Sequence, residues 1–319
     1  MQKTPTAVFI GQSPIDIITP VSEDFLAKYG IEKHGLKIIT PEISSLIESE
    51  IKSPLYIPGG CAANTACCFS RLKGTAIFNG KIADDDFGRL FLKSLESEGV
   101  KTGDGAFRKA NRPCDHIYIF ITPDHDRSFA SCIGITSEIA IEEIDNKCLK
   151  EADLVFLEGF LMANKGGYKT LYDAATLARE GDTPPLIAMC PCDSLIIRKN
   201  RKHIETLLEI TDILIMNDKE AKTIFPGWSI EDIITFCRKR FKAGAITFGA
   251  SGATGFREGR LHHAPAAEIR QHDIVNTNGA GDAFIGGFLY SYLSGDTLEE
   301  TIETAQNCAV EVLKREGAR

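Results

Sequence analysis

Short, continuous runs of apolar residues alternate with amphipathic stretches along almost the whole chain. The apolar runs that we expect to be buried strands lie at residues 7–10, 76–78, 154–157, 186–189, 213–216 and 245–248. Helical patterns lie at residues 64–72, 87–98, 168–179, 200–208 and 230–241, and two longer ones close the chain at 282–293 and 298–314. Apolar strands that alternate with helices are typical of a mostly parallel sheet covered on both faces. The pattern therefore predicts an α/β fold.

Two stretches depart from this pattern. Residues 15–57 are irregular and punctuated by prolines, and residues 116–121 alternate strictly, with isoleucines on one face and Tyr118 and Phe120 on the other. A turn at residues 123–126 lets residues 128–133 return as a partner strand. We expect one domain over residues 1–319, with a β lid of about residues 14–57 and 112–135 inserted in the α/β core. The alternative for the hairpin is a peripheral edge of the sheet.

The charge of the chain limits its partners. The 36 Lys and Arg against 44 Asp and Glu give a formal net charge of −8, with no long basic run. Nucleic acid and anionic membrane surfaces are therefore not expected as main partners. No stretch approaches the eighteen or so apolar residues of a membrane span, and no signal peptide is expected before the first strand, so the cytosol is the predicted location.

Cysteine and histidine patterns do not predict a metal or redox site. The ten cysteines are scattered, and Cys190 and Cys192 lack the two-residue spacing of a zinc or redox pair. We expect reduced, mostly buried thiols. His262 and His263 have no cysteine at ligand spacing, and Gly11-Gln12-Ser13 is not a dinucleotide fingerprint, which counts against a dehydrogenase.

The strongest motif is Asn-Thr-Asn-Gly-Ala-Gly-Asp-Ala-Phe at residues 276–284. Its small residues stand where a helix begins, so free N–H groups and the positive end of the helix dipole point at one spot. That spot suits phosphate oxygens, and Asp282 in the first turn is placed to take a proton from an attacking hydroxyl. Simple helix capping is the alternative for an isolated first-turn Asp.

Residues 276–284 resemble the C-terminal signature of the ribokinase-like (PfkB) kinases of sugars and nucleosides. Residues 59–66 and 80–88 resemble the N-terminal signature, so the likeness spans nearly the whole chain in the right order. Residues 21–30 and Thr277-Asn278 favour the adenosine-kinase branch. The resemblance implies a three-layer α/β/α ribokinase-like fold with a small β lid, in a monomer or homodimer that uses ATP and Mg²⁺. It leaves open a monovalent cation such as K⁺.

The resemblance also implies roles for individual residues. Asp282 is the implied general base, and the implied anion hole around the transferring phosphoryl group consists of Gly279, Ala280 and Gly281. The implied substrate-binding residues are Asp16, Gly59, Gly60, Asn64, Asp85 and Leu161. A carboxylate such as Asp16 can accept hydrogen bonds from two vicinal hydroxyls. For Asp85, capping of the helix at residues 87–98 is an equal alternative.

On the nucleotide side, the resemblance implies ATP contacts from Asn217, Thr247, Gly249, Gly252 and Asn307. Glu220 is the implied metal residue, and Mg²⁺ keeps several waters and needs only one or two carboxylates. Taken alone, residues 217–220 also fit a helix cap with a first-turn acid, and residues 247–252 fit an ordinary Gly-rich turn. For Asn307, an exposed polar position on the last helix fits the sequence nearly as well as a contact with ATP.

Several residues depart from the family pattern. Asn276 replaces the usual Asp near the metal, and Pro113-Cys114-Asp115 replaces the usual turn before the lid strand. Leu161 stands where the adenosine-kinase branch has an aromatic residue after Gly159-Phe160. Arg127 fits either phosphate binding or a plain exposed turn.

The sequence thus predicts an ATP-dependent kinase for a hydroxymethyl group of an adenosine-like nucleoside or another sugar substrate. A free-sugar kinase of the ribose or fructose type is the first alternative. The second is a non-catalytic sensor that binds nucleotide or sugar on the same fold.

Overall fold

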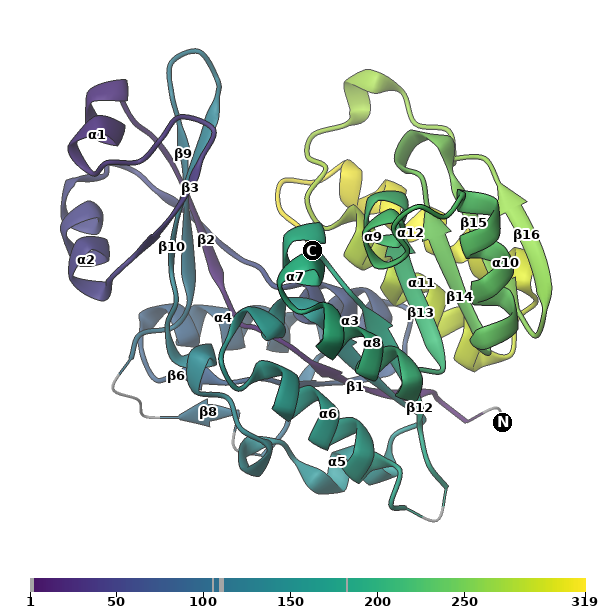
Figure 1. The fold of residues 1–319 in the computed structure, drawn as a ribbon. Coiled ribbons are helices and arrows are strands. Elements are labelled where there is room, and N and C mark those ends of the chain that lie inside the picture. Colours follow the sequence, from purple (N-terminus) through teal and green to yellow (C-terminus); the bar gives the residue numbers. More distant parts are fainter. Residues whose placement is uncertain (1–2, 105, 109–111, 182) are drawn as a thin grey trace.

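A nine-stranded sheet forms the centre of the computed structural model, which describes residues 3–104, 106–108, 112–181 and 183–319 (Figure 1). The strand order is β16-β15-β14-β13-β12-β11-β1-β5-β7. The strands are β1 Thr6–Ile10, β5 Thr75–Asn79, β7 Lys101–Thr102, β11 Leu154–Glu158, β12 Leu186–Cys190, β13 Ile213–Asn217, β14 Ala243–Thr247, β15 Ala253–Arg257 and β16 Arg260–Ala264. All are parallel except β15 and β16, which are antiparallel additions at one edge. The predicted mostly parallel sheet is confirmed.

Helices cover both faces because the strand residues alternate between two apolar cores. Phe9 of β1 belongs to one core and Val8 to the other. The first core is covered by α3 Cys61–Arg71, α4 Asp86–Ser97, α11 Ala280–Ser294 and α12 Leu298–Leu313. The second is covered by α5 Asn146–Glu151, α6 Gly167–Ala178, α7 Ser194–Lys199, α8 Arg201–Ile210, α9 Asp218–Ile224 and α10 Ile230–Arg240. The three predicted layers are therefore present.

The remaining elements are short. A two-stranded sheet pairs β6 Ile82–Ala83 with β8 Phe107–Arg108. The 3₁₀ helices are η1 Ile135–Glu138, η2 Ile141–Glu143, η3 Gly159–Ala163, η4 Gly249–Ser251 and η5 Gln271–Asp273.

A separate five-stranded sheet stands beside the core, at the left of Figure 1. Its order is β3-β10-β9-β2-β4, with β2 Ile15–Pro20, β3 Leu36–Ile39, β4 Leu55–Pro58, β9 His116–Ile121 and β10 Arg127–Cys132. These strands lie within the segments predicted to form the lid. The hairpin of β9 and β10 has Ile121 opposite Arg127, as the turn at residues 123–126 predicts.

The irregular stretch at residues 15–57 contains two helices that the sequence pattern did not predict. They are α1 Glu23–Lys28 and α2 Pro41–Glu50, and both cover the outer face of the lid sheet (Figure 1). Phe25 of α1 packs against Phe120, with ring centroids 5.6 Å apart, and the Ser44 hydroxyl of α2 lies 2.9 Å from the Tyr118 hydroxyl. The buried face of β9 is therefore the aromatic one.

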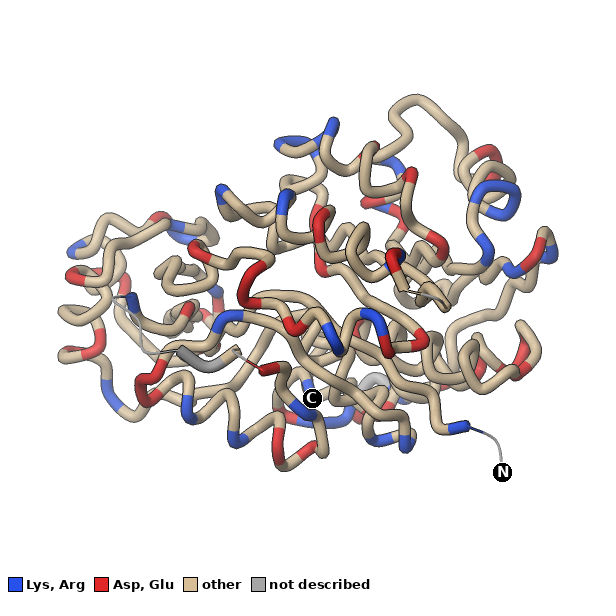
Figure 2. The backbone as a smooth tube through the Cα atoms, turned by 90° about the horizontal axis from the view of Figure 1, so that it is seen from below, with Lys and Arg blue, Asp and Glu red and all other residues tan. Residues whose placement is uncertain are grey.

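Charged residues are spread along the whole backbone rather than gathered in one basic stretch (Figure 2). Among the described residues, no helix combines the length and the apolar composition that crossing a membrane requires.

Candidate functional site

The carboxyl ends of the parallel strands meet at one edge of the central sheet, which is where open α/β sheets place their ligands. The last residues of four neighbouring strands are Glu158 of β11, Cys190 of β12, Asn217 of β13 and Thr247 of β14. The start of α11 lies at the same edge, because Asp282 lines a cavity of about 170 Å³ together with Asn217 and Thr247. The fold thus brings the C-terminal signature block to the strand ends.

The start of α11 is built for close approach by an anion. Gly279 is the N-cap residue with φ +79°, in the left-handed region, and it supplies no side-chain cap to the helix. The first N–H groups of a helix have no intrahelical partner. A Cβ at Gly281 would meet no atom within 4 Å, so the helix start faces open space. The predicted anion hole therefore has the free donors and the room that a phosphoryl group requires.

Asp282 lies in the first turn of α11 beside Asn64 of α3. The Asn64 amide Nδ2 donates to Asp282 Oδ2 at 2.8 Å, whereas the buried Asn64 Oδ1 has no partner. Burial raises the pKa of Asp282 to about 6, partly opposed by hydrogen bonds from Cys61 and Asn64. A carboxylate with a pKa near neutrality is a better proton acceptor than an ordinary Asp. The orphaned Oδ1 is an acceptor available to a donor on a ligand.

Asp16 lies on lid strand β2, against the turn that precedes α3. A Cβ at Gly59 would lie 3.4 Å from Asp16 Oδ2, and a Cβ at Gly60, which has φ +93°, would lie only 2.6 Å from Gln12 O. Glycine is therefore required at position 60, whereas a Cβ at position 59 would make only an ordinary van der Waals contact with Asp16. Burial raises the pKa of Asp16 to about 6, and the positive charge of Arg319 partly opposes this. The lid thus contributes one carboxylate to a site whose other carboxylate is on the core.

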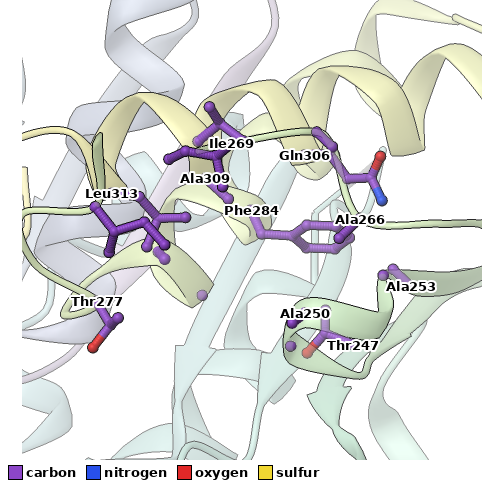
Figure 3. A pocket seen from close by; sticks show the side chains of 17 residues that line it. Thr247, Ala250, Ala253, Ala266, Ile269, Thr277, Phe284, Gln306, Ala309 and Leu313 are labelled. Atoms are coloured by element: carbon purple, nitrogen blue, oxygen red, sulfur yellow. The ribbon is translucent and has the colours of Figure 1, made fainter. Parts of the chain in front are cut away.

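An apolar cavity of about 400 Å³ opens beside the anion hole (Figure 3). Its walls come from the turn after β14 and from α11 and α12, and the residues include Thr247, Gly249, Gly252, Phe284, Gln306 and Leu313. Thr247, Gly281 and Phe284 also line the smaller cavity that contains Asp282, so the two cavities adjoin. The size and apolar lining suit a small-molecule ligand such as a nucleotide base.

Two residues do not lie where the sequence predicted them. Asn307 is exposed on α12 and does not line the cavity, whereas its neighbour Gln306 does, donating to Pro265 O at 2.7 Å. Leu161 in η3 is fully buried in the second core, and Phe160 lines the smaller cavity instead. In both places the helical turn rotates the expected side chain away, so Gln306 and Phe160 replace Asn307 and Leu161 as candidate contacts.

Asn217 and Glu220 form a complete capping box at the start of α9. Glu220 N donates to Asn217 Oδ1 at 2.9 Å, and Glu220 Oε2 and Oε1 accept from Asn217 N and Nδ2 at 3.0 and 2.7 Å. Burial raises the pKa of Glu220 to about 8. The capping alternative is thus realised. The oxygens still border the smaller cavity, and a group that is held this firmly fits Mg²⁺ better through water than by direct ligation.

Other predicted positions have structural roles as well. Asp85 is the N-cap of α4, where Oδ1 accepts from Gly88 N and Oδ2 accepts from Cys114 N, each at 2.7 Å. Both of its oxygens are therefore occupied by backbone donors. Asn276 Oδ1 accepts from Asn278 N at 3.0 Å, which orders the turn before the anion hole. Arg127 is exposed at the start of β10.

Glu158 is a site residue that the sequence patterns did not reveal. Its Oε2 accepts from Ala62 N at 2.8 Å and its Oε1 from Gln12 N at 3.4 Å, so it caps α3, whose N-cap Gly60 has no side chain. Burial raises the pKa of Glu158 to about 8, and the nearby negative charge of Asp282 adds to this. A single Glu at the end of the apolar run 154–157 is the signal that could have revealed it.

Arg319 is a second residue near the site that the sequence did not predict. Its guanidinium lies 5.0 Å from the Phe91 ring centroid and donates to Cys67 Sγ at 3.8 Å, while Nε and Nη2 are buried without a partner. Its charge lowers the pKa of both Asp16 and Asp282. It therefore offsets part of the negative charge between the lid and the core.

A nucleotide-sized cavity that opens onto a free helix start, with a carboxylate of raised pKa beside it, suits the transfer of a phosphoryl group to a hydroxyl. The fold and this site together define the class as a small-molecule kinase of the α/β type.

Comparison with known proteins identifies the family. The sequence profile described as the pfkB family carbohydrate kinase matches residues 26–319, so the chain belongs to this family and is an ATP-dependent kinase. The chain is 28% identical to an ATP-dependent ribose-1-phosphate kinase of Halopiger xanaduensis, covering 85% of this chain and 86% of that protein. It is 26% identical to an adenosine kinase of Dictyostelium discoideum, with coverage of 97% and 94%.

The fold is also similar to that of solved structures of the family. The crystal structure of adenosine kinase from Sinorhizobium meliloti superposes with a TM-score of 0.86 at 27% identity, covering 99% of this chain and 96% of that chain. The ribokinase-like fold inferred from the two signature blocks is confirmed.

Proposed function

We propose that this kinase transfers the γ-phosphoryl group of ATP to a hydroxymethyl group of a nucleoside or another sugar substrate. In this proposal Asp282 accepts the proton of the acceptor hydroxyl. The start of α11, at Gly279, Ala280 and Gly281, holds the transferring phosphoryl group. The observation that carries the proposal is the position of Asp282, which lies in the first turn of α11 directly after Gly279, Ala280 and Gly281 and accepts from Asn64 Nδ2 at 2.8 Å.

The residues on the acceptor side support a polyhydroxylated substrate. Asp16 offers two acceptor oxygens, and Asn64 Oδ1 offers another, so a substrate with vicinal hydroxyls can donate to both. A substrate held at Asp16 would be fixed relative to Asp282 before reaction, which is where much of the rate advantage of a kinase originates.

The nucleotide side is assigned by the same reasoning. We assign the base of ATP to the apolar cavity walled by Phe284 and Leu313, and its phosphates to the space that leads from Gly252 to Gly281. The oxygens of Asn217 and Glu220 would hold Mg²⁺ through water, and the ion would neutralise phosphate charge. The backbone N–H groups at the start of α11 would stabilise the same phosphate charge independently of the ion.

Among possible acceptors, an adenosine-like nucleoside is our first choice. Adenosine kinases occur among both the relatives and the similar structures. Phe160, which is 36% exposed and borders the smaller cavity, supplies near the acceptor side the aromatic surface that Leu161 cannot offer. A free sugar is the second choice, because the relatives also include the Escherichia coli fructokinase, at 25% identity.

The test of the base is Asp282→Asn, which keeps the shape and removes the proton acceptor. Loss of a general base costs about 10²–10⁴ in rate, and the KM of the acceptor should change far less than kcat. Asp86→Asn is the matched control, because Asp86 is also a first-turn acid, on α4, and is exposed. Turnover of folded Asp282→Asn within tenfold of the parent would falsify the assignment.

The acceptor is tested by a screen of nucleosides and free sugars at fixed Mg·ATP, with ADP release as the readout. Adenosine as the best acceptor supports the first choice, whereas ribose or fructose preferred by more than tenfold rejects it. Binding of nucleotide without turnover of any acceptor would instead favour the non-catalytic sensor.

A further inference from the structure

Three cysteine side chains from distant parts of the sequence meet beside Asp282. They are Cys61 at the start of α3, Cys190 at the end of β12 and Cys192 two residues later, which we call the cysteine trio. Their sulfur atoms all lie within 4.8 Å of one another, and Cys192 Sγ is 3.7 Å from Cys61 Sγ. The proposed kinase reaction uses none of these thiols, so their grouping calls for its own explanation.

The spacing matches that of sulfur ligands around one metal ion. A tetrahedral zinc ion with Zn–S bonds of about 2.3 Å holds its sulfurs about 3.8 Å apart. Small side-chain adjustments would therefore bring all three sulfurs to one ion. Among the residues that the structure describes, no other group of three His, Cys, Asp or Glu side chains offers ligand atoms this close together.

The surroundings of the cysteine trio would let a metal ion enter and would offer it a fourth ligand. Cys61 and Cys190 are buried, whereas Cys192 is partly exposed with φ +70°, an unusual conformation for a residue other than glycine. All three line the cavity of about 170 Å³ that also contains Asp282. Cys61 donates a hydrogen bond to Asp282, so a carboxylate oxygen is within reach of the same space.

Chemistry selects the class of cation. Thiolates prefer soft or borderline ions such as Zn²⁺, whereas Mg²⁺ prefers oxygen, so the trio and the oxygens of Asn217 and Glu220 would not compete for the same ion.

We propose that the cysteine trio binds a thiophilic divalent cation of the zinc type and that the bound cation inhibits the kinase. Three S–H bonds break, their protons pass to solvent and three metal–sulfur bonds form, so no electron changes hands. The ion occupies the space beside Asp282 and competes with the acceptor hydroxyl for that carboxylate. Binding does not depend on the proposed function; the inhibition rests on the role proposed for Asp282.

Zinc binding is tested on the full, reduced chain, with Zn²⁺ alone as the probe. Equilibrium dialysis should give one ion per chain, and alkylation followed by mass spectrometry should show Cys61, Cys190 and Cys192 protected by zinc. Cys192→Ser should weaken binding by about a hundredfold or more, exceeding the 10–100-fold cost of losing a supporting group of a metal site. Cys148→Ser is the matched control, because Cys148 is also partly exposed and lies on α5, outside the trio.

Co²⁺ substitution supplies a second readout, since a tetrahedral thiolate site gives intense visible absorption that Cys192→Ser should abolish. Zinc bound equally by the parent and Cys192→Ser, protection of other cysteines, or no zinc retained after dialysis would each overturn the site. A disulfide between Cys61 and Cys192 in place of metal binding would overturn it as well.

Inhibition is measured separately, as the activity of each protein with zinc divided by its own activity without zinc. The parent and Cys148→Ser should lose activity together at one equivalent, whereas Cys192→Ser should need about a hundredfold more zinc. Bound zinc with undiminished activity would refute the inhibitory part alone. An inactive parent in the absence of zinc would refute the proposed function and leave the metal site standing.

Discussion

Glu158→Gln should stabilise the protein at alkaline pH, because the carboxyl group is buried at 1% exposure and carries a pKa of about 8. An ordinary Glu has a pKa near 4.5. Between these two values the folded state holds a proton that the unfolded state has released. Unfolding is therefore favoured progressively as the pH rises, which is the sign expected when the folded state binds more protons.

The magnitude follows from the separation of the two pKa values. About 3.5 pH units at 1.36 kcal/mol each give roughly 5 kcal/mol over the full range, of which about 4 kcal/mol falls between pH 5 and pH 8. The amide of Gln cannot ionise, and its oxygen can still accept from Ala62 N, so the cap on α3 is kept. The variant should lose this part of the pH dependence while retaining the fold.

Urea unfolding of the parent and Glu158→Gln at pH 5 and pH 8 measures the effect. The quantity to compare is the urea midpoint of the variant minus that of the parent. With an m-value of about 3 kcal/mol/M, this difference should be larger at pH 8 than at pH 5 by about 1 M or more. Glu303→Gln is the matched control, because Glu303 is exposed on α12 and should leave the two curves parallel. Parallel curves for Glu158→Gln would refute the argument that burial holds this carboxyl group neutral.

Three further measurements test the site. The kcat/KM of the parent should rise with pH through about 6 and then level, because Asp282 and Asp16 both have pKa values of about 6 and act as carboxylates; a flat profile from pH 5 to 8 would contradict this. Gly252→Ala should lower the free energy of unfolding by more than the 1–2 kcal/mol of left-handed strain and should raise the KM of ATP, because Gly252 has φ +94° and the added Cβ would lie 2.1 Å from Ala264 O. Gly227→Ala is the control in urea unfolding: Gly227 has φ +85° but open space around it, so this variant should show the strain alone. Asp85→Ala removes the cap of α4 and should lower the free energy of unfolding by about 0.5–2 kcal/mol. If the variant also raises the acceptor KM more than tenfold, Asp85 contacts the substrate as the sequence predicted.

The central sheet could be predicted because its strands are buried on both faces and therefore appear as unbroken apolar runs. The lid hairpin was predictable for the opposite reason, since one face of β9 is more buried than the other. Helix α2 escaped prediction because Pro41 resembles a break in the pattern, whereas proline is well suited to the first turn of a helix, here after Thr40 as the cap.

The site was predictable where it depends on the main chain and less so where it depends on side-chain direction. Parallel strands place their ends together whatever the side chains are, so Asn217 and Thr247, which end neighbouring strands, lie at one edge of the sheet, whereas the role of Asp282 was implied by the family resemblance of residues 276–284. Leu161 and Phe160 differ by one residue, and only the 3₁₀ turn decides which of them faces the cavity. The cysteine trio could not be predicted, because 131 residues separate Cys61 from Cys192 and no local spacing signals their contact.

After β1 the chain leaves the central sheet through residues 11–14 and enters the second sheet as β2, which carries Asp16 (Figure 1). The two carboxylates of the site thus belong to different layers: Asp16 is on the lid sheet, whereas Asp282 is in the first turn of α11, which packs on the central sheet. Under the proposed function the acceptor must reach both carboxylates, so a sugar that contacts Asp16 but not Asp282 should bind without being phosphorylated and act as a competitive inhibitor. The connection at residues 11–14 should therefore influence which acceptor fits, because it sets where Asp16 lies relative to α11.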